Sequence, residues 1–430
     1  MTSLIRYTII FLLAGFISCL AYGQKEKLNK TSAGFPVNYD DDSVGSYILP
    51  DLLLMENGQI IKDSVMWMEK RRPEILHEIE LNQFGKTPPK PKELSFKVFD
   101  SGTSTFEGKA VRKQVTVYFT KDTSAYKMDL LIYIPSNADK PVPLFFIINF
   151  FANSSAVNDS GVKPGFIWTR DGKKILAPAN TGFGKLPVEK FLEQGIGVAT
   201  VYYGDIEPDF KAGIKYGIRG YYLKSGTTQP APDEWGAIAA WSWGLSRAMD
   251  YFETDPQIDE KRIVIQGTSR LGKTVLWTGG RDARFKMVIA SCSGEGGAAL
   301  SRRNYGENLL HLTDTSRYFY QFAANYHDFA AKPDSMPHDA HMLIALMAPR
   351  PLLLQTGNTD YWSDPKGEFL AAEAAEPVYN LFGEKGPGHI MPEAGDTSLL
   401  NPLGYYMHDG GHGLVPGDWD IFIEFIKKYL

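Results

Sequence analysis

Cysteine is nearly absent from this sequence, which has two in 430 residues, Cys19 and Cys292. Two cysteines cannot build the disulfide framework of a small secreted domain, so hydrophobic packing must stabilise the fold. An excess of positive charge is absent as well, because 45 Lys and Arg stand against 50 Asp and Glu and no Lys/Arg-rich block occurs. The sequence therefore offers no electrostatic footprint for nucleic acid.

The apolar run near the N-terminus is too short for a membrane span. Residues 9–21 are apolar, Arg6 precedes them, and small residues stand before Gln24. This is the pattern of an export signal, whereas a span needs roughly 20 apolar residues. We predict a signal peptide over residues 1–23 and an exported protein, periplasmic or secreted. The alternative is lipid attachment at Cys19, against which stands a Phe where such signals prefer Leu.

The rest of the chain has the composition of a folded protein. It is 43% hydrophobic, 13% aromatic and 22% charged, which suffices for a sizeable core. The length allows one large α/β enzyme or two domains. Because no repeat or low-complexity linker divides the chain, we predict an N-terminal extension over 24–62 and a single catalytic domain over 63–430. The polar part of the extension, 24–45, is expected to contribute little to function.

The apolar pattern changes from alternating to continuous along the chain. Apolar residues at helical spacing predict a helix over 63–84, and alternating runs then predict antiparallel strands over 94–99, 111–119 and 127–134. Continuous apolar runs predict buried strands over 144–148, 197–202, 262–265, 287–290 and 351–354. Helices are predicted over 237–252 and 418–429, and a further helix is predicted to follow the Gly-rich turn and to end at about Gly279. This alternation predicts an α/β fold, a three-layer αβα sandwich whose mostly parallel sheet begins with antiparallel strands.

A serine stands between two glycines where a buried strand turns into a helix. The segment is Gly267-Thr-Ser269-Arg-Leu-Gly272. On so tight a turn the serine Oγ projects from the sheet and the helix N-terminus faces the oxygen that becomes negative during attack on a carbonyl. Ser269 is therefore a candidate nucleophile. A phosphate-binding loop is the competing interpretation, but no metal-ligating Asp follows a nearby hydrophobic strand.

A serine nucleophile needs a base and an acid that orients the base. His412 lies among glycines just before the last helix, where a loop can carry its ring to Ser269; His408 is the alternative base. Asp360 follows a buried strand and a Gly turn, at the sheet edge where catalytic groups gather. Glu295, after the preceding strand, is the alternative acid.

Two histidine pairs have metal-ligand spacing. They are His338 with His341 and His408 with His412. Glycines place the second pair in a loop, and no H-E-x-x-H string occurs. We predict no metal site and no organic cofactor.

Four segments together resemble a known family. They are GTSRLGKT at 267–274, SGEGGAALSRR at 293–303, DYWSDPKGE at 360–368 and HDGGH at 408–412. They are similar to the glucuronoyl esterases of carbohydrate esterase family 15, α/β-hydrolases that cleave esters of (4-O-methyl-)glucuronic acid linking xylan to lignin. The resemblance implies that Arg270 donates to the oxyanion, where a guanidinium would offset negative charge.

The same resemblance implies roles for three further residues. The chain departs from the family at one position. Lys273, Glu307 and Trp362 would hold the hydroxyls of the uronic acid ring. Many members carry a catalytic Glu where this chain has Cys292. Asp360 matches the alternative position used by some bacterial-type members, so the resemblance also assigns the acid to Asp360.

The sequence thus predicts a secreted serine esterase with Ser269, His412 and Asp360 as its triad. Its expected partner is a polysaccharide that bears glucuronic acid, or an ester of it. One alternative is a carbohydrate acetyl esterase or general carboxylesterase with the same triad. The other is a non-catalytic glycan-binding protein on a decayed hydrolase fold.

Overall fold

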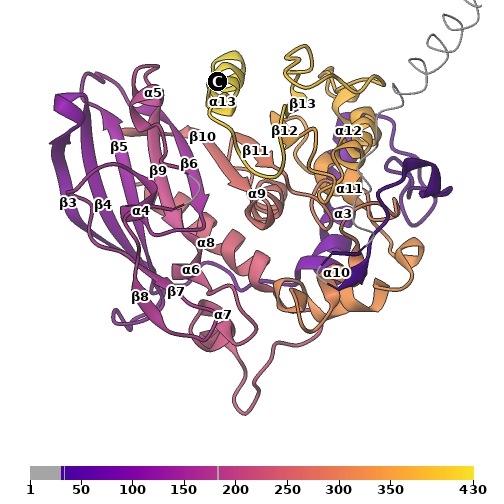
Figure 1. Ribbon diagram of the computed structural model, residues 1–430, viewed down its shortest axis with the longest axis horizontal. Coiled ribbons are helices and arrows are strands. Elements are labelled where there is room, and N and C mark those ends of the chain that lie inside the picture. Colours follow the sequence, from indigo (N-terminus) through magenta and orange to yellow (C-terminus); the bar gives the residue numbers. More distant parts are fainter. Residues whose placement is uncertain (1–30, 33, 182–183) are drawn as a thin grey trace, which may run out of the picture.

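A nine-stranded mixed sheet organises the molecule, in the order β13-β12-β11-β10-β6-β9-β5-β4-β3 (Figure 1). The computed structural model describes residues 31–32, 34–181 and 184–430. The predicted signal peptide and Cys19 lie outside the described residues. Within them, no helix combines the length and apolar character needed to cross a membrane.

Three antiparallel strands form one side of the sheet, as predicted. They are β3 (Ser95–Thr105), β4 (Ala110–Tyr118) and β5 (Lys127–Pro135). β5 also pairs antiparallel with β9, which joins this side to the parallel strands.

Six parallel strands form the rest of the sheet. They are β6 (Val142–Asn149), β9 (Gly197–Tyr202), β10 (Ile258–Thr268), β11 (Met287–Ser291), β12 (Leu352–Gly357) and β13 (Leu403–His408). Five of them coincide with the predicted buried runs, whereas β13 has no counterpart among the predicted strands. Because parallel strands end at one edge, the turns after β10, β12 and β13 lie at the same edge of the sheet.

Helices cover both faces of the sheet, so the predicted three-layer sandwich is confirmed. In β6, Leu144 and Phe146 pack on one side while Phe145 and Ile147 pack on the other. The first side meets α8 (Ala237–Phe252), α9 (Arg270–Arg281), α11 (Ala340–Ala345) and α12 (Pro365–Asn380). The second meets α5 (Val188–Leu192) and α13 (Asp418–Tyr429). Strands buried on both faces explain the continuous apolar runs.

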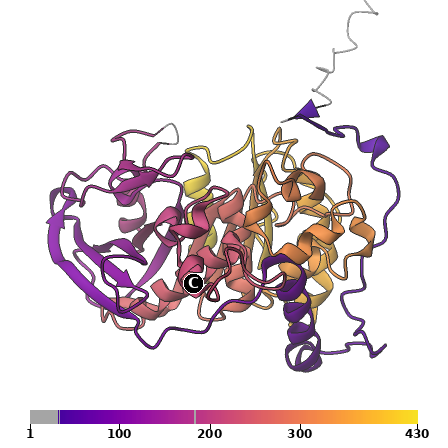
Figure 2. The same cartoon turned by 90° about the horizontal axis from the view of Figure 1, so that it is seen from below.

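The N-terminal part lies along the outside of the sandwich. Figure 2 shows the indigo chain running down the flank of the orange part before it enters the helices around α3 (Arg72–Ile79). The predicted helix over 63–84 is present as α2 (Ser64–Met66), α3 and two π-helical segments, Trp67–Arg71 and Glu80–Phe84.

Candidate active site

Ser269 occupies a strained turn between β10 and α9. Its backbone has φ 61° and ψ −127°, a conformation that residues other than glycine rarely adopt. Its N–H donates to Ser291 O at 2.8 Å, which fixes the turn against the end of β11. Strain of this kind is characteristic of functional sites and is retained only where the surroundings hold it.

The two flanking glycines are required by close backbone contacts. A Cβ on Gly267 would lie 2.3 Å from Leu271 O, and a Cβ on Gly272 would lie 2.8 Å from Ser291 O. Neither position has room for a side chain. Gly272 stands three residues after Ser269, at the point where α9 passes the end of β11.

Arg270, the first residue of α9, is held by an ion pair and by aromatic rings. Its Nη1 contacts the Asp209 carboxylate, and its guanidinium lies 4.9 Å from the centre of the Tyr318 ring and 5.9 Å from that of Phe150. The side chain is 28% exposed, so these contacts fix the guanidinium but leave it accessible from solvent. As the first helical residue, it also leaves its backbone N–H without an intrahelical acceptor.

Asp209 is a functional candidate that the sequence did not indicate. Its Oδ1 accepts hydrogen bonds from Tyr320 OH at 2.8 Å and Gln321 Nε2 at 2.7 Å, and its Oδ2 accepts one from Tyr203 OH at 3.1 Å. The carboxylate is 4% exposed, and both of its oxygens accept hydrogen bonds. A buried charge with this many partners holds Arg270 in one place.

His412 meets Asp360 at the carboxyl edge of the sheet. His412 Nδ1 lies 2.7 Å from Asp360 Oδ2 and 3.1 Å from Ser363 Oγ. Burial alone raises the pKa of Asp360, but the hydrogen bond and charge of His412 outweigh burial and hold that pKa below its ordinary value. The carboxylate is 2% exposed, whereas the imidazole is 44% exposed and accessible to a substrate.

The alternative acid and the alternative base have other partners. Glu295 is buried and accepts a hydrogen bond from Ser301 Oγ at 2.7 Å. His408 is not in a loop but ends β13, and its Nδ1 lies 3.0 Å from Asp418 Oδ2.

Cys292 lies beside the His412–Asp360 pair. The Sγ of Cys292, a carboxylate oxygen of Asp360 and a ring nitrogen of His412 all lie within 4.8 Å of one another. Sγ is 3.4 Å from both Gly413 N and Gly413 O, and burial raises the pKa of the thiol. A neutral thiol therefore occupies the position where the resemblance places a carboxylate.

Glu307 lies near both Lys273 and Trp362. Lys273 is buried and its Nζ donates to Ser293 O at 2.7 Å; burial lowers its pKa while the nearby Glu307 opposes that shift. Glu307 N donates to Trp362 O at 2.8 Å, and the Arg317 guanidinium lies 5.3 Å from the centre of the Trp362 ring.

The N-terminal extension packs against this region, which the sequence did not indicate. The Phe35 ring meets His311 edge-on at 5.3 Å, and His311 in turn lies 5.1 Å from Trp362. Burial and the charges of Asp360 and Glu307 raise the pKa of the Tyr39 hydroxyl. The extension therefore contributes to the surroundings of the candidate site.

The histidines of the other pair, His338 and His341, have different hydrogen-bond partners. His338 Nε2 lies 3.0 Å from Gln83 Oε1, and His341 Nε2 lies 2.9 Å from Pro50 O. Each ring has a separate partner on a different segment.

Glu368 is a buried acid behind the site. Its Oε1 accepts a hydrogen bond from Gly294 N at 2.6 Å, while its Oε2 has no hydrogen-bond partner among the described residues. Burial raises its pKa from the ordinary 4.5 to about 8. The carboxyl group is therefore protonated in the folded protein at neutral pH.

This protonation predicts a pH-dependent stability. Between pH 4.5 and about 8, Glu368 is ionised in the unfolded chain but protonated in the fold, so stability is lost as pH rises through this window. The slope is at most about 1.4 kcal/mol per pH unit. We expect Glu368→Gln to flatten the decline in unfolding free energy, measured by urea denaturation from pH 5 to 8. Glu424→Gln, at an exposed position, should keep the parental slope, and equal slopes in all three proteins would refute the assignment.

Comparisons with known proteins identify the family of this chain. A family model described as "Glucuronyl esterase, fungi" matches residues 177–383. Carbohydrate esterase MZ0003, from an unknown prokaryotic organism, is 41% identical over 402 residues, which cover 91% of this chain and 92% of that protein.

Solved structures give the same result. The glucuronoyl esterase from Solibacter usitatus superposes with a TM-score of 0.86 at 44% identity, covering 90% of this chain and 99% of that chain. A structure described as a promiscuous CE15 esterase from the marine bacterial metagenome has a TM-score of 0.83 at 40% identity, covering 92% of this chain and 100% of that chain. The chain is a carboxylic ester hydrolase and belongs to the glucuronoyl esterases of carbohydrate esterase family 15.

Proposed function

We propose that this protein hydrolyses esters of glucuronic acid and of its 4-O-methyl derivative through a covalent intermediate on Ser269. The observation that carries the proposal is the 2.7 Å contact between His412 Nδ1 and Asp360, at the sheet edge where Ser269 stands on its strained turn. Asp360 orients the imidazole and stabilises its protonated form, so the other ring nitrogen, Nε2, is the base.

The reaction proceeds in two displacements. Ser269 Oγ bonds to the ester carbonyl carbon as His412 Nε2 takes the hydroxyl proton. Collapse of the tetrahedral intermediate breaks the bond to the leaving alcohol, which receives that proton. Water, deprotonated by His412, then attacks the acyl group and releases the uronic acid with free Ser269.

Arg270 stabilises the oxyanion in both displacements. Its N–H lies at the start of α9, where the helix dipole also favours negative charge. Its guanidinium adds positive charge from a position fixed by Asp209. Lys273, Glu307 and Trp362 bind the hydroxyls of the uronic acid ring, which distinguishes a uronate from a simple acyl group.

This arrangement predicts a kinetic effect for Asp209. In Asp209→Asn the amide no longer neutralises Arg270, so the guanidinium shifts while Ser269 and its base remain. We expect kcat to fall about 10-fold to 100-fold with KM changed less than threefold, since loss of one oxyanion donor costs about 10²–10³. Steady-state kinetics on methyl glucuronate measures this. A change confined to KM would contradict the role assigned to Asp209.

The natural substrate is, in this proposal, an ester between xylan-borne glucuronic acid and a lignin alcohol. The support is the family to which the chain belongs and the export pattern of residues 1–23. An enzyme for plant cell-wall polymers must leave the cytoplasm, so the proposal includes export.

A broader esterase is the second candidate. It is favoured by the name of the 40% identical relative, a promiscuous esterase, and by the 44% exposure of the His412 side chain. Purified enzyme offered methyl glucuronate beside an aryl acetate separates the two. We expect kcat/KM for the uronate ester to exceed that for the acetate at least 10-fold, and a clear preference for the acetate would overturn the glucuronoyl proposal.

A further inference from the structure

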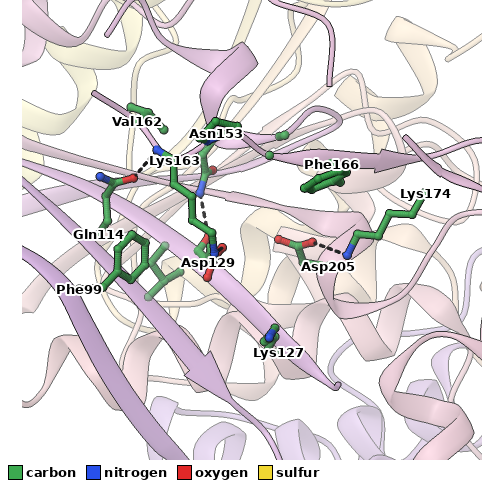
Figure 3. A pocket seen from close by; sticks show the side chains of 14 residues that line it. Phe99, Gln114, Lys127, Asp129, Asn153, Val162, Lys163, Phe166, Lys174 and Asp205 are labelled. Carbon is green, nitrogen blue, oxygen red and sulfur yellow. Dashed lines mark hydrogen bonds and ion pairs between the residues drawn. The ribbon is translucent and has the colours of Figure 1, made fainter. Parts of the chain in front are cut away.

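A pocket separate from the proposed triad opens between the antiparallel strands and the β7–β8 hairpin. It has a volume of about 240 Å³. β7 (Phe166–Trp168) and β8 (Lys174–Leu176) form one wall, and β5 with Phe99 of β3 forms another (Figure 3). Its lining includes none of the residues assigned to catalysis or to binding of the uronic acid ring. The volume is below the roughly 300–1,000 Å³ of sites for drug-sized ligands, so it suits one small ring.

The charged groups of the pocket are two lysine–aspartate pairs and a third lysine, Lys127, whose Nζ donates to Thr123 O at 2.9 Å. Lys163 Nζ lies 2.7 Å from Asp129 Oδ2, so this pair is already neutral. Figure 3 shows Lys174 and Asp205 facing each other beside Phe166, with Nζ 3.9 Å from Oδ1. That separation exceeds a hydrogen bond, so a hydroxyl could accept from Lys174 and donate to Asp205.

These groups select a neutral, hydroxylated ligand. A carboxylate or phosphate could not donate a hydrogen bond to Asp205, and a metal cation would be repelled by the three lysines. The exposed ring of Phe166, 48% accessible, offers an apolar face for one side of a sugar ring.

The pocket is connected to the proposed active site through one short helix, α6 (Tyr203–Ile206). Asp205 of α6 lines the pocket. Tyr203 of the same helix donates to Asp209, the partner of Arg270. A sugar in the pocket would therefore contact the helix whose Tyr203 helps to hold the Asp209–Arg270 pair.

We propose that this pocket binds an uncharged pyranose residue of the glycan that carries the uronate ester. The inference rests on the proposed function for its choice of glycan. The carbohydrate probes are xylotetraose and cellotetraose, titrated into the full protein by isothermal calorimetry. We expect one of them to bind with a Kd on the order of 1 mM.

Three variants locate the binding. Phe166→Ala and Asp205→Ala should each raise Kd at least fivefold, and Asp205→Asn, which keeps an acceptor, should restore most of the affinity. Ile175→Ala is the matched control, because Ile175 is 44% exposed on the same hairpin but does not line the pocket. Unchanged Kd in both alanine variants at 166 and 205 would overturn the proposal.

A measurement on the unmodified protein is independent of how the variants fold. Bound sugar should slow reductive methylation of Lys163 and Lys174, read by peptide mass spectrometry, while Lys224, 75% exposed, should react at the same rate. No binding of either probe, or no protection of these two lysines, would overturn the pocket assignment. Hydrolysis of methyl glucuronate by the same preparation, measured separately, shows whether the proposed function itself holds.

Discussion

Replacing Ser269 by alanine is expected to lower kcat on methyl glucuronate about 10⁶-fold, as loss of a serine nucleophile does in other triad enzymes. The Oγ is the only atom removed, so KM should change little. The variant should keep its fold, because Gly267 and Gly272 set the turn in which residue 269 has φ 61°. Initial rates at high enzyme concentration, with thermal unfolding as the check on folding, measure this.

The matched control is Ser335→Ala, which removes an exposed hydroxyl far along the chain from the nucleophile turn. It should retain parental rates within twofold. Turnover that is unchanged in Ser269→Ala would contradict the covalent mechanism. If the parent itself shows no turnover yet binds xylan, the glycan-binding alternative is favoured.

Asp360→Asn is expected to lower kcat about 10⁴-fold, the effect of the same change in a Ser-His-Asp triad. The amide can hold His412 only in the wrong tautomer, because its NH₂ would donate to Nδ1 where the carboxylate accepts at 2.7 Å. The remaining nitrogen, Nε2, would then carry a proton and could not act as the base. Steady-state kinetics from pH 5 to 9 measures the loss.

Glu295→Gln is the matched control for Asp360→Asn. Glu295 is also a buried carboxyl group, but it bonds Ser301 at 2.7 Å, so its substitution should cost less than tenfold. Cys292→Ser should likewise retain most activity, since the thiol contacts Gly413 and has no assigned role in the reaction. The opposite ranking, with Glu295→Gln the more damaging, would transfer the role of the acid to Glu295.

The elements predicted most closely are those whose signal is local. β9, α8 and α13 have the predicted bounds because their apolar residues follow one period without interruption. β13 was not predicted, since Leu403–His408 contains Gly404 and is stabilised by pairing with β12. α12 was missed as well, because Pro377 interrupts its helical pattern and Ala and Glu dominate its composition.

The same distinction applies to the site. Ser269 could be singled out because two glycines and a strand-to-helix change surround it within a few residues. Asp209 could not, because it lies 61 residues from Arg270 in the chain and carries no motif. Tyr39 belongs to an extension whose polar composition indicated no function, and only the packed chain brings it near Asp360 and Glu307.

Trapping of the acyl-enzyme tests the central claim most directly. Enzyme mixed with excess methyl glucuronate and quenched in acid within milliseconds is digested and analysed by peptide mass spectrometry. The mechanism predicts one glucuronoyl group on the peptide that carries Ser269, and none in Ser269→Ala. An adduct on the peptide with Cys292, or steady turnover by Ser269→Ala, would contradict it.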